Sequence, residues 1–345
     1  MEYPFKNKKQ AGAILSFGEL LLRICPDAEG QWLDDNVLPF YVGGAELNVA
    51  TALALWGLPS KYFTVLPGNH LSAQIIAYLQ KKNIDTGPVF YDGLRIGLYF
   101  LTKGRDMKHN ALIYDRAHSA FAGLETGMVD WDMILEDVSW FHFSAICPAV
   151  SQKAADVCKE ALEAASKRNI TISVDLNYRA KLWQYGRSPL EVMPDLVQYC
   201  DLVMGNIWAA ETMLGIAVPA GINERTEKSG YLDAAKLASD QIIQQYDNCQ
   251  VVANTFRFDG GDEINYYTTL YTGDNFYHSN PYQTTRIVDK VGSGDCFMAG
   301  LIYGFNHAMS PADTLEFATA AAFEKLFIES DATNQTVDQI KKAIK

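Results

Sequence analysis

The segment with the clearest chemical potential runs from Asp289 to Asp295 and reads DKVGSGD. Its glycine-rich centre allows a tight turn in which several backbone N–H groups point at one spot. A helix that starts directly after the turn adds unsatisfied N–H groups and the positive end of a helix dipole. Such a spot favours an anion such as a phosphate. The sequence therefore predicts an anion-binding turn formed by Gly292, Ser293 and Gly294.

Asp295 ends this segment and is a candidate general base. It falls in the first turn of a predicted helix at 294–307, in which Phe297, Leu301 and Phe305 recur at every fourth position. A carboxylate there could accept a proton from a hydroxyl group while nearby amides hold the phosphoryl group that the hydroxyl attacks. The alternative is an ordinary strand-to-helix turn in which Asp295 serves only as a cap.

The composition restricts the partners of the chain. Of its 345 residues, 48% are hydrophobic and 20% are charged, which is typical of a globular protein. The formal net charge of -12 argues against nucleic acid or an anionic membrane as the main partner, because both attract basic surfaces. A bound phosphate would therefore be held by local amides, by a few placed Arg or Lys side chains and by metal ions.

Other compositional features favour a cytoplasmic protein. The six cysteines lack paired C-x-x-C spacing, which predicts reduced thiols in place of disulfides or a zinc site. Residues 1–11 are polar and precede no apolar segment of signal-peptide type, so we expect a disordered N-terminal lead. No apolar run is long enough to span a membrane.

The elements that would position the turn alternate between strands and helices from residue 138 onward. Strands are predicted at 138–144, 170–175, 201–204 and 251–255, and helices at 151–168, 189–199, 207–214 and 232–246. This alternation predicts an α/β fold with a doubly wound, mostly parallel sheet and helices on both faces. Ligands of such sheets bind beyond the carboxyl ends of the strands, where Asp175, Asn206 and Thr255 would lie.

Two stretches with strand character interrupt this alternation and predict a small β-sheet lid. We therefore expect an α/β core formed by residues 12–20, 44–93 and 118–345, and a lid formed by residues 21–43 and 94–117. The Tyr- and Thr-rich residues 263–286 predict antiparallel edge strands. The lid would have open edges and an apolar face (Leu98, Phe100, Leu112 and Tyr114) that a second copy could cover, so we expect a homodimer or a higher homo-oligomer.

Two motifs carry a resemblance to a known family. Gly43 and Gly44 precede a helix that contains Asn48, and the late motif D-x-x-G-x-G-D spans 289–295. In this order the two motifs resemble those of the ribokinase/PfkB family of sugar kinases, and the resemblance covers nearly the whole chain. It implies a ribokinase-like core with a β lid, ATP as the phosphate donor, Mg²⁺, and Asp295 as the catalytic base.

Within this family the chain most resembles the 2-keto-3-deoxygluconate kinases. The residues that carry this closer resemblance are GLYF at 97–100, Y-x-R-x-x-S-A at 114–120 and D-x-N-x-R at 175–179. The resemblance implies sugar-acid contacts from Tyr99, Tyr114, Arg116 and Arg179, with Gly43, Gly44 and Asn48 beneath the sugar and Asp331 closing the pocket. An Arg offers a carboxylate a planar fork at any pH, and a Tyr offers an apolar face and a hydroxyl.

Simpler interpretations of these residues stay open at the level of sequence. Arg116 could be a surface residue on a flap turn, and Arg179 could form an ion pair with Asp175. Tyr99 and Tyr114 could be ordinary aromatic residues of strands.

Some positions depart from the family pattern. The motif N-x-x-E, associated there with hydrated Mg²⁺ and phosphates, is altered because Glu211 lies two positions too far from Asn206. Asn206 is therefore the expected metal and nucleotide residue, and Glu211 could act only through water. Thr255, Arg257, Gly292 and Gly294 are the other expected nucleotide contacts, although Arg257 could be solvated. Asp289 could help to bind a monovalent cation such as K⁺ through backbone oxygens, or could cap a strand end.

These observations predict an ATP-dependent kinase that phosphorylates the terminal hydroxyl of 2-keto-3-deoxygluconate to give the 6-phosphate. One alternative is a kinase for a neutral sugar or a nucleoside, of the fructose, ribose or adenosine type. Another is a catalytically silent sensor of sugar acids on the same scaffold. Neither an early G-x-G-x-x-G nor a Walker motif occurs, which argues against a dehydrogenase or a P-loop enzyme.

Overall fold

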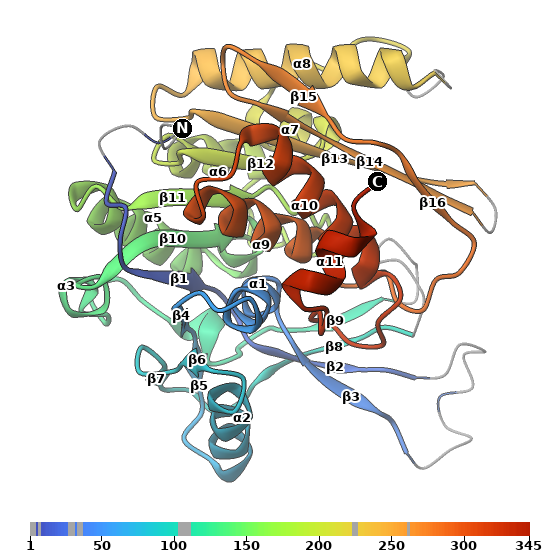
Figure 1. Cartoon of the computed structure of the whole chain (residues 1–345). Coiled ribbons are helices and arrows are strands. Elements are labelled where there is room, and N and C mark those ends of the chain that lie inside the picture. The colour runs from blue at the N-terminus through green and yellow to red at the C-terminus, as the bar shows by residue number, and fades with distance from the viewer. Residues whose placement is uncertain are drawn as a thin grey trace.

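The computed structural model describes residues 5, 8–26, 32, 37–102, 112–222, 227–260 and 263–345. Within these residues the centre is a ten-stranded sheet (Figure 1). Its strands follow the order β15 (Phe276–His278), β14 (Glu263–Tyr271), β13 (Val251–Gly260), β12 (Leu202–Gly205), β11 (Thr171–Asp175), β10 (Val138–Ser144), β1 (Ala13–Phe17), β4 (Ser60–Phe63) and β6 (Ile84–Asp85). β16 (Tyr282–Thr284) pairs with β14 off this path.

The sheet is parallel from β13 to β6 and antiparallel at the β14 edge. Every residue of β10 and β11 is buried, as expected for parallel strands that are covered on both faces. Along β10, Phe141 and Phe143 pack into one hydrophobic cluster and Trp140 packs into another on the opposite face. The prediction of a mostly parallel sheet with antiparallel edge strands is confirmed.

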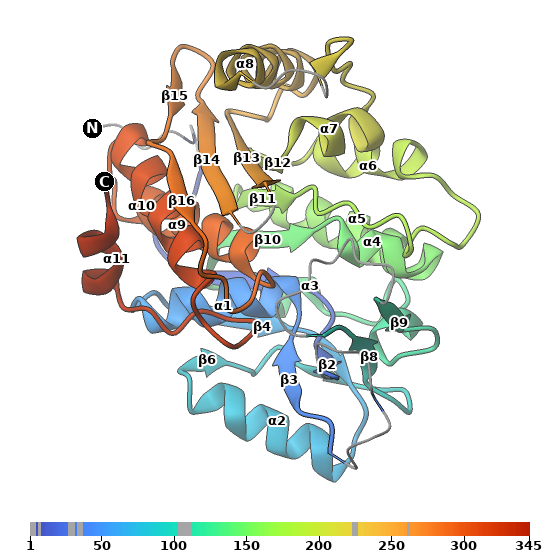
Figure 2. The same ribbon diagram turned by 90° about the vertical axis from the view of Figure 1, so that its right-hand side faces the viewer.

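Helices cover both faces of the sheet, as Figure 2 shows. One face packs against α5 (Gln152–Lys167), α6 (Pro189–Val197), α7 (Ile207–Leu214) and α8 (Lys228–Gln245). The other face packs against α1 (Ala45–Leu55), α9 (Ser293–Asn306), α10 (Pro311–Lys325) and α11 (Val337–Ala343). The remaining helices of the described chain are α2 (His70–Gln80), α3 (Trp131–Ile134), α4 (Ile146–Val150) and a 3₁₀ turn at Phe121–Gly123.

Helix α9, which begins at the late motif, is held in place by close packing on α10. A Cβ on Gly300 would lie 2.5 Å from the Cα of Ala318, and one on Gly304 would lie 2.6 Å from the side chain of Thr314. The absence of side chains at the two glycines therefore lets the helices approach closely. This contact packs the middle and the end of α9 closely against α10.

A separate four-stranded sheet lies within the two stretches that were predicted to form a lid, and it is called the lid below. Its strand order is β3 (Phe40–Gly43), β2 (Leu21–Ile24), β8 (Gly97–Phe100) and β9 (Ile113–Asp115). A two-stranded sheet of β5 (Val65–Leu66) and β7 (Phe90–Tyr91) accompanies it. The expected small sheet is thus present, although parts of the predicted lid, residues 27–31, 33–36 and 103–111, lie outside the described residues. Of its predicted apolar face, Leu112 is buried and Leu98 and Phe100 are half-buried.

The expectation of a disordered N-terminal lead is wrong for the residues that the structure describes there. Phe5 is buried and packs edge-on against Trp140 and Phe305 at centroid distances of 5.3 Å. Lys8 forms an ion pair of 2.9 Å with Asp201. The N-terminal run is mostly polar and too short to show a hydrophobic period, so the sequence could not predict this packing. Over the described ranges, no helix combines the length and apolar character that crossing a bilayer requires.

Candidate active site

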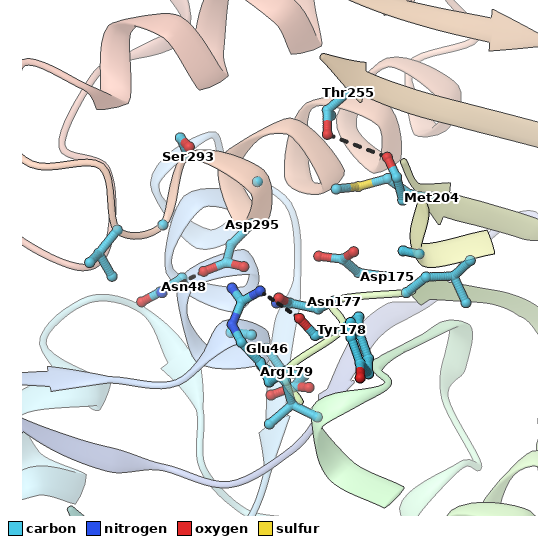
Figure 3. Close-up of a pocket in the computed structure, with 18 of the residues that line it drawn as sticks. Glu46, Asn48, Asp175, Asn177, Tyr178, Arg179, Met204, Thr255, Ser293 and Asp295 are labelled. Atoms are coloured by element: carbon cyan, nitrogen blue, oxygen red, sulfur yellow. Dashed lines mark hydrogen bonds between the residues drawn. The ribbon is translucent and has the colours of Figure 1, made fainter. Parts of the chain in front are cut away.

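A cavity of about 440 Å³ lies at the carboxyl ends of the central strands, between the core and the lid. This volume is within the range of small-molecule sites. The core contributes the ends of β11, β12 and β13 and the starts of α1 and α9, and the lid contributes Leu21, Tyr99 and Tyr114. Figure 3 shows several of the lining side chains converging on this space.

The predicted anion-binding turn borders the cavity. Gly292 caps α9 in the left-handed conformation, with φ of 81°, and Ser293 and Gly294 open the helix. A Cβ at Gly292 would lie 1.8 Å from the backbone oxygen of Asp331, so the position requires glycine. The first N–H groups of a helix have no partner within it, and here they face a polar cavity. The turn therefore has the geometry of an anion site.

Asp295 lies in the first turn of α9 and is 8% exposed. Its Oδ2 accepts a hydrogen bond of 2.7 Å from Asn48 Nδ2 on α1 (Figure 3). Burial raises the pKa of Asp295 to about 7, although the bond from Asn48 and the charge of Arg179 act against this rise. A carboxylate with this pKa is suited to accept a proton near neutral pH.

Asp175 brings a second carboxylate to the same cavity, from the end of β11. Burial, and then the negative charge of Asp295, raise the pKa of Asp175 to about 8. The sequence analysis placed Asp175 at a strand end but gave it no role in the reaction. Its place as the first residue of D-x-N-x-R at the edge of a parallel sheet was the available signal.

Glu46 is a third buried acidic residue of the cavity wall, and the sequence analysis did not select it. Its Oε1 accepts hydrogen bonds from the Ser144 N–H at 3.0 Å, from the Ser144 hydroxyl, and from Cys147 Sγ at 3.2 Å. Burial raises the pKa of Glu46. A Cβ at Gly18 would lie 2.0 Å from Glu46 Oε2, so the glycine leaves the space that the carboxylate occupies.

Arg116 borders the cavity, but its guanidinium is bound to the protein itself. Its Nε and Nη2 lie 2.7 and 2.6 Å from Glu19 Oε2. The Arg116 side chain is 5% exposed, so the alternative of a solvated flap residue is wrong. The sequence analysis did not select Glu19. Because both residues are buried, the pair presents the cavity with a nearly neutral wall.

Arg179 is half-buried and extends into the cavity from the segment after β11 (Figure 3). Its Nη1 donates to the backbone oxygen of Tyr178 at 3.0 Å. Its Nε is buried without a hydrogen-bond partner among the described residues. Its positive charge favours the ionised forms of Asp175 and Asp295.

Tyr99 and Tyr114 both line the cavity and use their hydroxyl groups differently. The Tyr99 hydroxyl donates to Asp331 Oδ2 at 2.6 Å, so its proton is already used within the protein. The Tyr114 hydroxyl and the Asn48 Oδ1 atom are buried and unpartnered within the described part of the chain. An unmet buried polar atom costs about 1–3 kcal/mol. A polar ligand in the cavity would supply the missing partners.

The prediction that Asp331 closes the pocket on the substrate is wrong. Asp331 is fully buried and does not line the cavity, because its Oδ1 lies 2.9 Å from Arg23 Nε and its Oδ2 is bound by Tyr99. Gly43 is also set back from the cavity, since a Cβ there would lie 2.2 Å from Asp331 Oδ2. Gly44 does line the cavity.

The two other predicted metal-binding residues, Asp289 and Glu211, do not line the cavity. Asp289 is buried, with Oδ2 at 2.5 Å from Arg23 Nη2 and Oδ1 accepting from the Val291 N–H at 3.1 Å. Glu211 is exposed on α7 and does not border the cavity. The position of Glu211 therefore does not support a role in metal binding at this cavity.

The cavity is also lined by three of the five predicted nucleotide residues, Asn206, Thr255 and Arg257, in addition to Gly292 and Gly294 of the turn. Asn206 caps α7 by accepting from the Ala209 N–H at 2.9 Å, and Thr255 donates to the Gly205 oxygen at 3.3 Å. Further lining residues that the sequence analysis missed are Trp208, Tyr266 and Lys290. Across the described side chains, no group of three His, Cys, Asp or Glu residues could hold a metal ion by itself.

Comparison with known proteins gives a consistent result. The profile described as pfkB family carbohydrate kinase matches residues 13–334. The structure of 2-dehydro-3-deoxygluconokinase from Thermotoga maritima is similar, with a TM-score of 0.86 and 32% identity over 96% of this chain and 98% of that one.

Two relatives found by sequence are also named as sugar-acid kinases. A 2-dehydro-3-deoxygalactonokinase from Haloferax volcanii is 28% identical and covers 96% of each chain. A 5-dehydro-2-deoxygluconokinase from Geobacillus thermodenitrificans is 26% identical over 88% of this chain and 84% of its own. Because the profile spans nearly the whole chain and the fold and cavity agree with it, this protein belongs to the pfkB family of carbohydrate kinases.

Proposed function

We propose that the protein is an ATP-dependent kinase that phosphorylates the terminal hydroxyl of 2-keto-3-deoxygluconate (2-dehydro-3-deoxygluconate) to give the 6-phosphate. One observation carries the kinase chemistry: a buried carboxylate with a pKa of about 7, Asp295, directly follows the left-handed Gly292 turn. The similarity to a 2-dehydro-3-deoxygluconokinase supports the choice of substrate.

In the proposed reaction Asp295 accepts the proton of the sugar hydroxyl. The hydroxyl oxygen forms a bond to the γ-phosphorus of ATP while the bond from that phosphorus to the bridging oxygen breaks, and ADP leaves with that oxygen. The amides that open α9 face the negative charge on the transferred group, which they stabilise without rearrangement. Each of these groups is already on the cavity wall.

ATP would occupy the end of the cavity lined by Asn206, Thr255 and Arg257. Lys290 lines the same cavity and forms an ion pair with Asp259, whose Oδ2 lies 3.0 Å from its Nζ. When bound with the nucleotide, Mg²⁺ would neutralise charge on the donor phosphates. Because the described residues offer no acidic cluster for a metal, the phosphates themselves would supply many of its ligands, with Asn206 nearby.

The sugar would occupy the end of the cavity between α1 and the lid. The unpartnered Tyr114 hydroxyl and Asn48 Oδ1 are positioned to meet its hydroxyl groups. Arg179 is the better candidate for the substrate carboxylate, because Arg116 is already neutralised by Glu19. Arg116 would then help to bind the sugar indirectly, because it forms part of the cavity wall together with Glu19.

A substrate panel with ATP and Mg²⁺ tests this proposal. It compares 2-keto-3-deoxygluconate with its galactonate epimer, 5-keto-2-deoxygluconate, fructose, ribose and adenosine, using a coupled assay for ADP. We expect the highest kcat/KM for a 2-keto-3-deoxy sugar acid. A preference for a neutral sugar or adenosine would overturn the acid assignment, and sugar-acid binding without any turnover would indicate the catalytically silent sensor.

A further inference from the structure

Lys325, the last residue of α10, is a buried cation to which the reaction above assigns no role. Its side chain has no exposed surface. The ammonium donates to the Ile328 backbone oxygen at 3.2 Å, its one hydrogen bond within the described ranges. A Cβ built on Gly292 would lie 3.4 Å from Lys325 Cε, so the side chain packs against the anion-binding turn. A charge in this position acts directly behind the site of phosphoryl transfer.

The surroundings of Lys325 contain two buried carboxylates, Asp289 and Asp331. Their charges favour the protonated ammonium, although burial lowers the pKa of Lys325. Both carboxylates also contact Arg23 of the lid, at 2.5 Å from Asp289 and 2.9 Å from Asp331. The remaining oxygens accept from the Val291 N–H and the Tyr99 hydroxyl. Both oxygens of Asp289 and Oδ2 of Asp331 therefore accept a hydrogen bond, while Asp331 Oδ1 lies beside Arg23 Nε in an ion pair but accepts no hydrogen bond from the described residues.

The cluster is also balanced in charge. Two carboxylates, Asp289 and Asp331, face two cations, Arg23 and Lys325, and all four side chains are fully buried. A further cation would leave an uncompensated buried charge, which is strongly unfavourable. These residues therefore do not fit the K⁺ ion that the sequence led us to expect beside Asp289.

The cluster lies close enough to the turn to control its position. The Asp331 backbone oxygen would lie 1.8 Å from a Cβ on Gly292, so the backbone at residue 331 packs directly against the turn. Asp289 and Val291 belong to the same motif as the turn. A change of charge here would therefore be transmitted to the N–H groups that face the cavity.

We propose that Lys325 is a built-in counter-cation that holds the phosphate-binding turn in place, so that phosphoryl transfer does not require a monovalent metal ion. Lys325 touches no substrate, so it is a positioning residue that acts through Gly292. The proposal rests on the family's phosphoryl transfer and not on the identity of the sugar.

The first experiment measures turnover of the wild-type enzyme in chloride salts of K⁺, Na⁺ and tetramethylammonium at equal ionic strength. We expect equal turnover in all three, because the ammonium is already in place. Strong activation by K⁺ over tetramethylammonium would overturn the proposal.

The second experiment compares Lys325→Ala with Lys325→Met. Both remove the charge, and we expect turnover to fall by roughly 10²-fold in each, in line with the loss of one preorganised electrostatic group. Only the alanine variant opens a space, so only its turnover should recover in K⁺, ammonium or methylammonium. Met fills the space and serves as the matched control. Wild-type turnover in Lys325→Met, or equal rescue of both variants, would contradict the proposal.

A third readout does not depend on catalysis. The thermal unfolding midpoint of the ligand-free Lys325→Ala protein should rise with K⁺ or ammonium relative to tetramethylammonium, whereas wild type and Lys325→Met should not respond. If the sugar assignment is wrong but this pattern holds, the inference on Lys325 stands. If neither variant folds, the salt comparison on the wild type decides.

Discussion

The side-chain amide of Asn48 donates a 2.7 Å hydrogen bond to the Asp295 carboxylate and thereby joins α1 to α9 at the cavity. The two residues are 247 positions apart in sequence and belong to the two motifs that identified the family. The bond favours the ionised form of Asp295, while burial favours the protonated form. The balance sets a pKa of about 7, near the pH at which the base must work.

Asn48→Leu should raise the pKa of Asp295 above about 7, because it removes the donor that stabilises the carboxylate. The base must be ionised to act, so the acidic limb of the profile of kcat/KM against pH should move to higher pH. Activity should fall more on the acidic side of neutrality than on the basic side. An acidic limb in the same place as in wild type would show that this bond does not tune the base.

Asp175→Asn should move the acidic limb in the opposite direction. The negative charge of Asp295 raises the pKa of Asp175, and the interaction is reciprocal, so removing one carboxylate makes the other easier to ionise. The acidic limb should therefore shift to lower pH. The measurement is the profile of kcat/KM against pH for Asp175→Asn, compared with the profiles of wild type and Asn48→Leu. A shift to higher pH would contradict the proposed coupling.

The same two carboxylates predict how stability changes with pH. Their folded-state pKa values, about 7 for Asp295 and about 8 for Asp175, exceed the value of roughly 4 for an unfolded chain. The folded protein therefore holds these protons more tightly, and its free energy of unfolding should decrease as pH rises from about 4 to 8. Asp175→Asn should reduce this decrease. Chemical denaturation of the wild type and of Asp175→Asn at several pH values measures the free energy of unfolding. If it changed equally with pH in both proteins, Asp175 would not have the raised pKa described here.

Arg116→Ala should raise the KM for the sugar far more than the KM for ATP, because Arg116 and Glu19 form the wall at the sugar end. The variant also leaves the buried Glu19 carboxylate without its ion-pair partner, which should lower the free energy of unfolding by about 3–5 kcal/mol. The double variant Arg116→Met with Glu19→Gln removes both charges and should recover stability without recovering sugar binding. Equal effects on the two KM values would remove the argument for sugar recognition.

A homodimer formed through the lid stays a prediction. The outer strands of the lid sheet, β3 and β9, expose Phe40 to 56% and Ile113 to 49%, and a second copy could cover them. Native mass measurement should give twice the chain mass, and Ile113→Lys should shift the population to monomer without loss of folding. A monomeric wild-type protein at working concentrations would exclude the predicted dimer.

The sequence was sufficient to predict the layers of the fold, because they follow from local periodicity. Helix α7 occupies the predicted range 207–214, and β10 occupies 138–144. Parallel strands buried on both faces leave long apolar runs that are easy to recognise. The late motif likewise predicted the turn at Gly292, because its glycines serve a local conformation.

The sequence was not sufficient to predict which charges neutralise each other. Arg23 pairs with Asp289 over 266 positions, and Tyr99 binds Asp331 over 232. Nothing local distinguishes such residues from ligand-binding ones, so Asp331 was assigned to the substrate. Glu19 and Glu46 were not selected as site residues, and Asp175 was placed at the ligand-binding edge without a role, because only the folded chain brings the three carboxylates to one cavity.

The central claim is that Asp295 takes the proton from the acceptor hydroxyl, and Asp295→Asn tests it most directly. The variant keeps the size of the side chain, so the unfolding midpoint and the sugar affinity measured by calorimetry should stay close to wild type. The kcat with 2-keto-3-deoxygluconate, ATP and Mg²⁺ should fall by roughly 10²–10⁴. A variant that binds the sugar and retains nearly normal kcat would show that another group acts as the base.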